Sequence, residues 1–166
     1  MIYKILTFIV LISAISACGP DFYIMNTDFI VLDGAEPPCD LADVYREMRS
    51  EISSNLRHIS IGTSTKTVSK IFRTTVILRP SWNPPNSIYY PNLGVVDGLY
   101  EPDAIQVRLI GNSILDSALI HEFAAHRVPD ILFQDENARH DTKYKKFERT
   151  IRQNVVNKTS GICSIN

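Results

Sequence analysis

The chain has 166 residues, of which 45% are hydrophobic and 21% are charged, a composition typical of one globular domain with a proper core. Its formal net charge of −1 leaves no overall basic footprint, so nucleic acid is not an expected partner. The sequence contains no internal repeat and no low-complexity run.

Residues 1–17 have the pattern of a targeting segment rather than of the folded domain. Lys4 supplies a minimal positive region, and the apolar run over 5–15 is too short for a normal transmembrane span. The run Ile-Ser-Ala-Cys that ends at Cys18 resembles the lipobox of a bacterial lipoprotein signal peptide, in which the cysteine thiol accepts diacylglycerol before cleavage. The resemblance implies a mature chain that is lipid-anchored through Cys18 in a bacterial cell envelope, on the outer membrane if the cell has two, because Gly19 rather than Asp follows. The alternative is an ordinary signal peptide, which would leave Cys18 as a spare thiol.

Two cysteines remain once Cys18 is acylated. An exported compartment permits disulfides, and Cys39 and Cys163 have only each other as intramolecular partners. We therefore expect a Cys39–Cys163 bridge that ties the start of the domain to its C-terminal tail. In the chain-entropy model so long a loop stabilises the fold by about 4 kcal/mol. Two unpaired thiols are the alternative, and a metal role is disfavoured because neither cysteine lies in a CxxC motif.

The hydrophobic periodicity predicts an α+β domain over 39–166, preceded by a tether over 18–38 in which residues 29–34 favour a short strand. In chain order, the patterns predict a helix over 41–56, a shorter helix over 64–72, a strand over 74–78, a proline-rich loop over 80–91, strands over 95–100 and 104–110 joined by a turn at 101–103, an apolar helix after residue 112, and a last helix over 141–155.

The apolar helix after residue 112 carries the residues of greatest chemical interest. It is apolar on almost every side, which is typical of a buried helix, yet it contains His121, Glu122 and His126. A fourth ionisable residue, His140, opens the following helical pattern. Buried ionisable groups are costly unless they are paired or bind a metal, so this cluster suggests a metal site.

These residues resemble the zinc-binding helix of the zincin metallopeptidases, with one departure. In that family two histidines lie four residues apart, and a glutamate beside the first acts as general base. Here Ala125 occupies the second histidine's position and His126 follows it. Four residues of a regular helix bring side chains back to within about 40° of each other, whereas five residues leave them about 140° apart. Downstream, the spacing of His140 and Phe147 is similar to a segment that follows this helix in small zincin-like bacterial lipoproteins.

Three explanations of the shifted histidine remain open. A local π-bulge would add one residue to the turn and bring His126 back towards His121; such bulges are rare but favour functional sites. A second explanation is a pseudoenzyme that has lost its zinc. In the third, the two histidines are satisfied polar residues near a helix C-terminus, where a histidinium is favoured by the helix dipole.

The resemblance implies a small zincin-like domain, in which a short antiparallel or mixed sheet packs against the apolar helix and flanking helices. It also implies a zinc ion held by His121, His126 and His140, with Glu122 as the catalytic general base in peptide-bond hydrolysis. Asp135 and Glu136 are alternative ligands, groups that orient a histidine, or side chains of a solvated loop. The expected partners are the membrane and a peptide or envelope protein. The competing hypothesis is a catalytically inactive zincin-fold lipoprotein that serves as a binding or assembly module.

Overall fold

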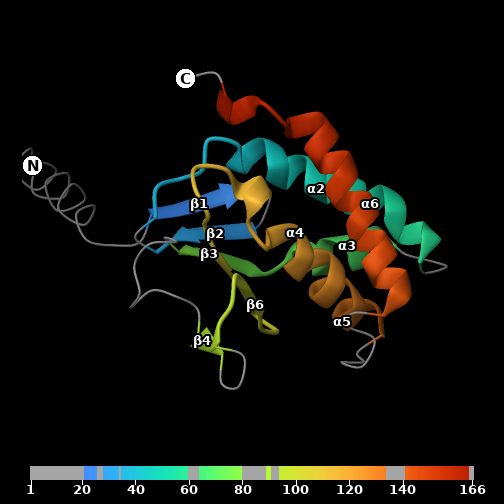
Figure 1. The fold of residues 1–166 in the computed structure, drawn as a ribbon. Coiled ribbons are helices and arrows are strands. Elements are labelled where there is room, and N and C mark those ends of the chain that lie inside the picture. The colour runs from blue at the N-terminus through green and yellow to red at the C-terminus, as the bar shows by residue number, and fades with distance from the viewer. Residues whose placement is uncertain are drawn as a thin grey trace, which may run out of the picture.

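The computed structural model describes residues 21–25, 28–33, 35–59, 64–79, 89–90, 94–133 and 141–164. A mixed sheet lies beside a group of helices, in agreement with the predicted α+β class (Figure 1). Five strands form the sheet in the order β1-β2-β3-β7-β6. The three inner strands run parallel, and the strand at each edge is antiparallel to its neighbour. These strands are β1 (Asp21–Met25), β2 (Asp28–Leu32), β3 (Thr75–Arg79), β6 (Gly98–Tyr100) and β7 (Ala104–Arg108), while β4 (Tyr89–Tyr90) and β5 (Gly94–Val95) pair separately.

The helices contain one segment of unusual geometry. Short 3-10 turns at Leu56–His58, Ile114–Asp116 and Ile162–Ser164 follow or precede the longer helices. Between α4 and α5 the chain forms a π-helix, Glu122–Arg127, in which each turn contains one residue more than in an α-helix. The α-helices are α2 (Leu41–Asn55), α3 (Thr65–Phe72), α4 (Leu119–His121), α5 (Val128–Phe133) and α6 (Thr142–Thr159).

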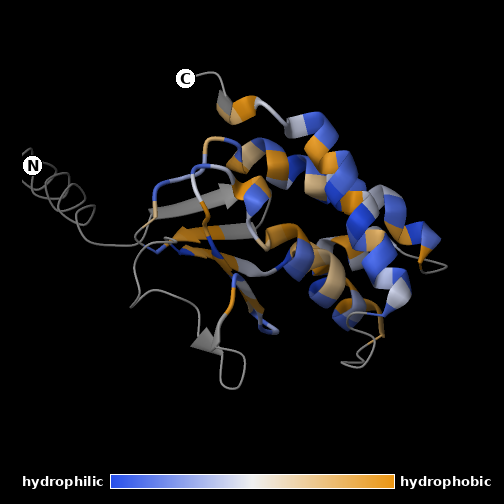
Figure 2. Ribbon diagram, in the orientation of Figure 1, coloured by the Kyte–Doolittle hydropathy of each residue, from blue (hydrophilic) through white to orange (hydrophobic). Residues whose placement is uncertain are grey.

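The core lies between the inner strands and the helices. Apolar residues mark the central strands and the helix faces turned towards them (Figure 2). Three aromatic rings meet in this core: Tyr45 of α2, Phe72 of α3 and Phe123 of the π-helix, with ring centroids 5.4 to 6.4 Å apart. Because Phe123 is fully buried in this cluster, the residues on either side of it are held at a defined position in the fold.

The predicted elements are largely confirmed. The helices over 41–56 and 64–72, the strands over 74–78 and 104–110 and the last helix correspond to α2, α3, β3, β7 and α6, although α6 extends to Thr159. The sheet also includes β1 and β2, so paired strands already begin within 18–38, where only a short strand over 29–34 was expected. The strand over 95–100 is interrupted, since β5 ends at Val95 and β6 begins at Gly98.

Cys39 and Cys163 form the predicted bridge, with their Cα atoms 5.5 Å apart. It fastens the C-terminal turn to the start of α2, at a point where the backbone N–H of Cys39 donates to the Asn112 carbonyl. Within the part of the chain that the structure describes, no helix has the length and apolarity needed to cross a membrane.

Candidate metal site

The π-helix brings His121 and His126 together. Its wider turn is seen in the bond from the backbone N–H of Val128 to the carbonyl of Phe123, five residues earlier. The two imidazole rings lie edge to face with centroids 5.1 Å apart. One ligand atom each of His121, Glu122 and His126 lie within 4.8 Å of one another. The five-residue spacing, which a regular helix would spread over about 140°, therefore places both histidines on one side of the helix.

Pro129 offers a local reason for the wider turn. It has no N–H, and in a regular helix its ring crowds the carbonyl four residues earlier, here that of Ala125. A regular helix would therefore already lose a hydrogen bond at this point, which lowers the cost of an irregular turn. Pro129 is a sequence signal for a local break in the helix that reasoning from histidine spacing alone overlooks.

Glu122 lies at the centre of the cluster and is only 4% exposed. Its Oε2 is 3.9 Å from His126 Nε2 and has no hydrogen-bond partner among the described residues. Burial raises the pKa of Glu122 to about 7; the charge of His121 lowers this pKa and the Glu148 carboxylate raises it. A carboxyl group with this pKa exchanges a proton readily near neutral pH.

His121 is held by Glu148 of α6. His121 Nδ1 is 3.1 Å from Glu148 Oε2, and because a carboxylate can only accept, Nδ1 carries the proton of this bond. The bond raises the pKa of His121 and lowers that of Glu148, which also has Arg152 3.5 Å away. Metal-binding histidines usually donate one ring N–H to such a carboxylate and bind the metal through the other ring nitrogen.

Sequence reasoning did not identify Glu148. The residue is the single acidic side chain in α6, and it lies one turn after Tyr144 of the buried stripe. An isolated carboxylate beside an apolar stripe is the signal that could have singled it out.

His126 lies against the edge strand of the sheet. Its side chain is 19% exposed, and its ring stacks on that of Tyr100 with centroids 6.0 Å apart and planes 20° apart. The next residue, Arg127, is buried and donates hydrogen bonds to carbonyl oxygens at the end of α3 and in the turn between β6 and β7. The π-helix is therefore fastened on its C-terminal side to both neighbouring elements.

The structure does not describe the remaining residues predicted for the site. His140, Asp135 and Glu136 lie outside the described residues, as does Cys18. A second group with metal-ligand atoms close together, formed by Cys39, Asp40 and Cys163, contains the disulfide and so lacks free thiolates.

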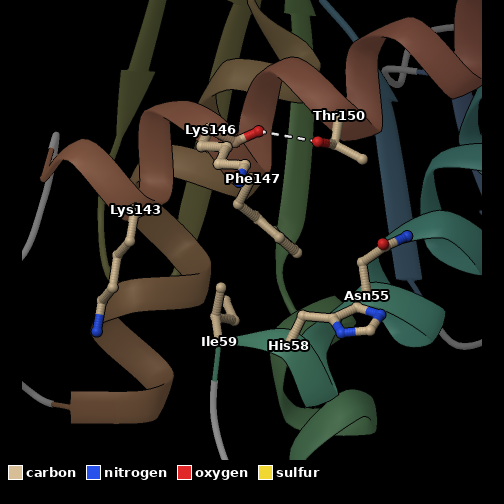
Figure 3. A pocket seen from close by; sticks show the side chains of 7 residues that line it. All are labelled: Asn55, His58, Ile59, Lys143, Lys146, Phe147 and Thr150. Atoms are coloured by element: carbon tan, nitrogen blue, oxygen red, sulfur yellow. Dashed lines mark hydrogen bonds between the residues drawn. The ribbon is translucent and has the colours of Figure 1, made fainter.

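A hollow between α2 and α6 is separate from the histidine cluster (Figure 3). His58, at the end of the 3-10 turn after α2, lines it. Two of its other polar side chains bond to the protein: Asn55 donates to Glu51, and Thr150 donates to the Lys146 carbonyl. None of its lining residues belongs to the histidine cluster found among the described residues.

The cluster fits a divalent metal ion. Two imidazoles are usual zinc ligands, and Glu122 presents an unpartnered, buried carboxylate oxygen beside them, where a metal-activated water could be accommodated. A buried anionic oxygen without a donor is costly, and a nearby cation or its water would remove that cost.

Comparisons with protein-family models, with curated proteins and with solved structures find no match to this chain. Its function is therefore inferred from the geometry of the site.

Proposed function

We propose that this protein is a zincin-like, metal-dependent peptidase, carried on the cell envelope by a lipid on Cys18. The observation that carries the proposal is the π-helix, which places His126 beside His121 and next to Glu122 despite the extra residue. His121 and His126 are two metal ligands, and His140 is the third, as its position in the sequence suggests. When bound, a zinc ion would activate a water and polarise the carbonyl of the scissile bond.

Glu122 is the proton acceptor in this proposal. It takes the proton of the attacking water and passes it to the leaving amine, a role that requires a carboxyl pKa near the working pH. Its pKa of about 7, caused chiefly by burial, suits that role. Glu148 supports the site from α6 because its bond to His121 Nδ1 sets the tautomer and the orientation of the ring.

The position of the edge strand β6 favours a peptide as the substrate. In the zincins, which this chain resembles, an extended substrate lies along a sheet edge beside the zinc helix and pairs with its backbone. Here β6 is the edge strand of the main sheet, and Gly98 on it lies directly against the Glu122 carboxylate. A peptide that paired with β6 would therefore pass close to the proton acceptor.

A second candidate is a catalytically inactive envelope lipoprotein that keeps this scaffold for binding or assembly. The near-complete burial of Glu122 favours it, because a proton acceptor must reach a water and the substrate. In this alternative the histidines and Glu122 are a buried polar cluster, and the protein holds a partner without cleaving it.

Metal content separates the two candidates. The full chain, purified in detergent, should contain close to one zinc ion per molecule, which His121→Ala or His126→Ala should remove. His58→Ala is the matched control, since it deletes a histidine outside the cluster, and it should keep the metal. Glu122→Gln should retain zinc but lose cleavage of a peptide library. A folded wild-type chain that binds no zinc would refute the peptidase and favour the binding module.

A further inference from the structure

Two residues of the edge strand β6 are spaced like two residues of the π-helix that faces it. Gly98 and Tyr100 are two apart on the strand, so both face the same side. Glu122 and His126 are four apart on the facing helix. Two strand residues advance by about 6.6 Å, and four residues of an α-helix advance by about 6 Å, somewhat less in a wider turn. Gly98 therefore lies opposite Glu122, and Tyr100 lies opposite His126.

The first of these contacts leaves no room for a side chain on the strand. A Cβ atom added to Gly98 would lie 2.4 Å from Glu122 Oε1 and 2.7 Å from the Cβ of Ala118. The strand backbone is thus in direct contact with the helix, which sets how closely β6 approaches the candidate site.

The second contact is made by an aromatic ring that is itself held in place. The Tyr100 hydroxyl donates to the Asp130 carboxylate and accepts a bond from Arg127 Nη1, 3.3 Å away. Arg127 and Asp130 follow His126 on the same helix, by one and by four residues. The Tyr100 ring is therefore held by its hydroxyl to the helix that carries His126, and its face lies against the His126 imidazole.

We propose that Tyr100 is a positioning residue that orients the His126 ring for metal binding. The inference deepens the proposed function and rests on it, because it assumes that His126 is a ligand. An aromatic face restricts the rotation of an imidazole packed on it, and offset stacking at this separation is favourable. His121 is oriented by a hydrogen bond to a carboxylate from α6, and Tyr100 orients His126 by stacking from the sheet. Loss of an aromatic stacking contact should weaken metal affinity roughly 3- to 10-fold.

Cobalt(II) is a suitable probe, because its visible absorption reports the ligand geometry as well as the affinity. We would titrate the full chain, in detergent, with cobalt for the wild type and for Tyr100→Phe, Tyr100→Met and His126→Ala. Leu99→Met is the matched control, since this neighbouring side chain points to the opposite side of the strand. Tyr100→Phe keeps the ring and should bind within about twofold of the wild type. Tyr100→Met should bind roughly 3- to 10-fold more weakly with an altered spectrum, and Leu99→Met should match the wild type.

The outcomes separate this inference from the proposed function. If the wild type binds no cobalt, both fail together. If it binds cobalt, loses it in His126→Ala, and Tyr100→Met has the wild-type affinity and spectrum, only the role of Tyr100 is overturned. Should Tyr100→Met fail to fold, NMR of the wild type decides: ring-to-ring contacts between Tyr100 and His126 in the cobalt-free and zinc-loaded chain are expected, and their absence overturns the inference.

Discussion

Removing one residue from the π-helix is the sharpest test of the relation between backbone and site. Deleting Ala125 shortens the spacing of the two histidines from five residues to four. In a regular helix four residues separate side chains by about 40°, so both imidazoles remain on one side without a wider turn. Phe123, buried in the aromatic cluster, and Arg127, bonded to α3 and to the turn after β6, hold the two ends of the segment in place.

The expected size of the effect follows from this geometry. The deletion variant should bind zinc within about tenfold of the wild type, which corresponds to about 1.4 kcal/mol. Inserting an extra alanine after Ala125 is the opposite change. Six residues of a regular helix leave the histidines about 120° apart, too divergent for one zinc ion, so zinc binding should fall below detection.

Both variants would be titrated with zinc against a chromophoric chelator, and their folding would be checked by circular dichroism and urea unfolding. A folded deletion variant that loses zinc would show that the site needs the π-helix itself rather than the spacing it restores. A folded insertion variant with wild-type affinity would refute the idea that both histidines hold the metal.

Three further predictions concern stability. Burial raises the pKa of Glu122 from 4.5 to about 7. The contribution of the protonated Glu122 carboxyl to the free energy of unfolding is therefore fully present below pH 4.5 and is lost as the pH rises through 7. The free energy of unfolding of the metal-free wild type, measured in urea, should fall by about 3 kcal/mol relative to that of Glu122→Gln over this pH range. If the free energies of the two proteins change in parallel with pH, burial does not raise this pKa. Arg127→Lys should lower the free energy of unfolding by at least about 2 kcal/mol, because one ammonium cannot reach the four carbonyl groups to which the guanidinium donates. An unchanged free energy of unfolding would show that water replaces the guanidinium. Cys39→Ser with Cys163→Ser should cost about 4 kcal/mol in the same assay, and equal stability of the wild type with and without reductant would argue against the bridge.

Most of the secondary structure could be predicted because it follows from local periodicity. Helix α2 repeats apolar residues at helical spacing, and strand β7 alternates buried and half-buried residues, as its sequence suggests. The pairing of Cys39 with Cys163 was predicted because the lipobox resemblance assigns Cys18 to a lipid and leaves only two cysteines. The region 18–38 was less predictable, since β2 overlaps the expected strand over 29–34 but β1, which pairs with it, was not expected.

The candidate site also has features that follow from local sequence and features that depend on contacts across the fold. The amino-acid pattern alone identifies the groups that are present: two histidines and a glutamate on a helix apolar enough to be buried, beside a strand that ends in Tyr100. Whether those groups meet depends on the folded arrangement. The turn around Ala125 is widened against the usual 3.6-residue period, which local propensity does not foresee, and contacts made across the fold hold the result. Glu148 reaches His121 from 27 residues away, and Tyr100 stacks on His126 from the sheet edge. Side-chain spacing along a helix is a local property, but the geometry of a site depends on packing between elements distant in sequence.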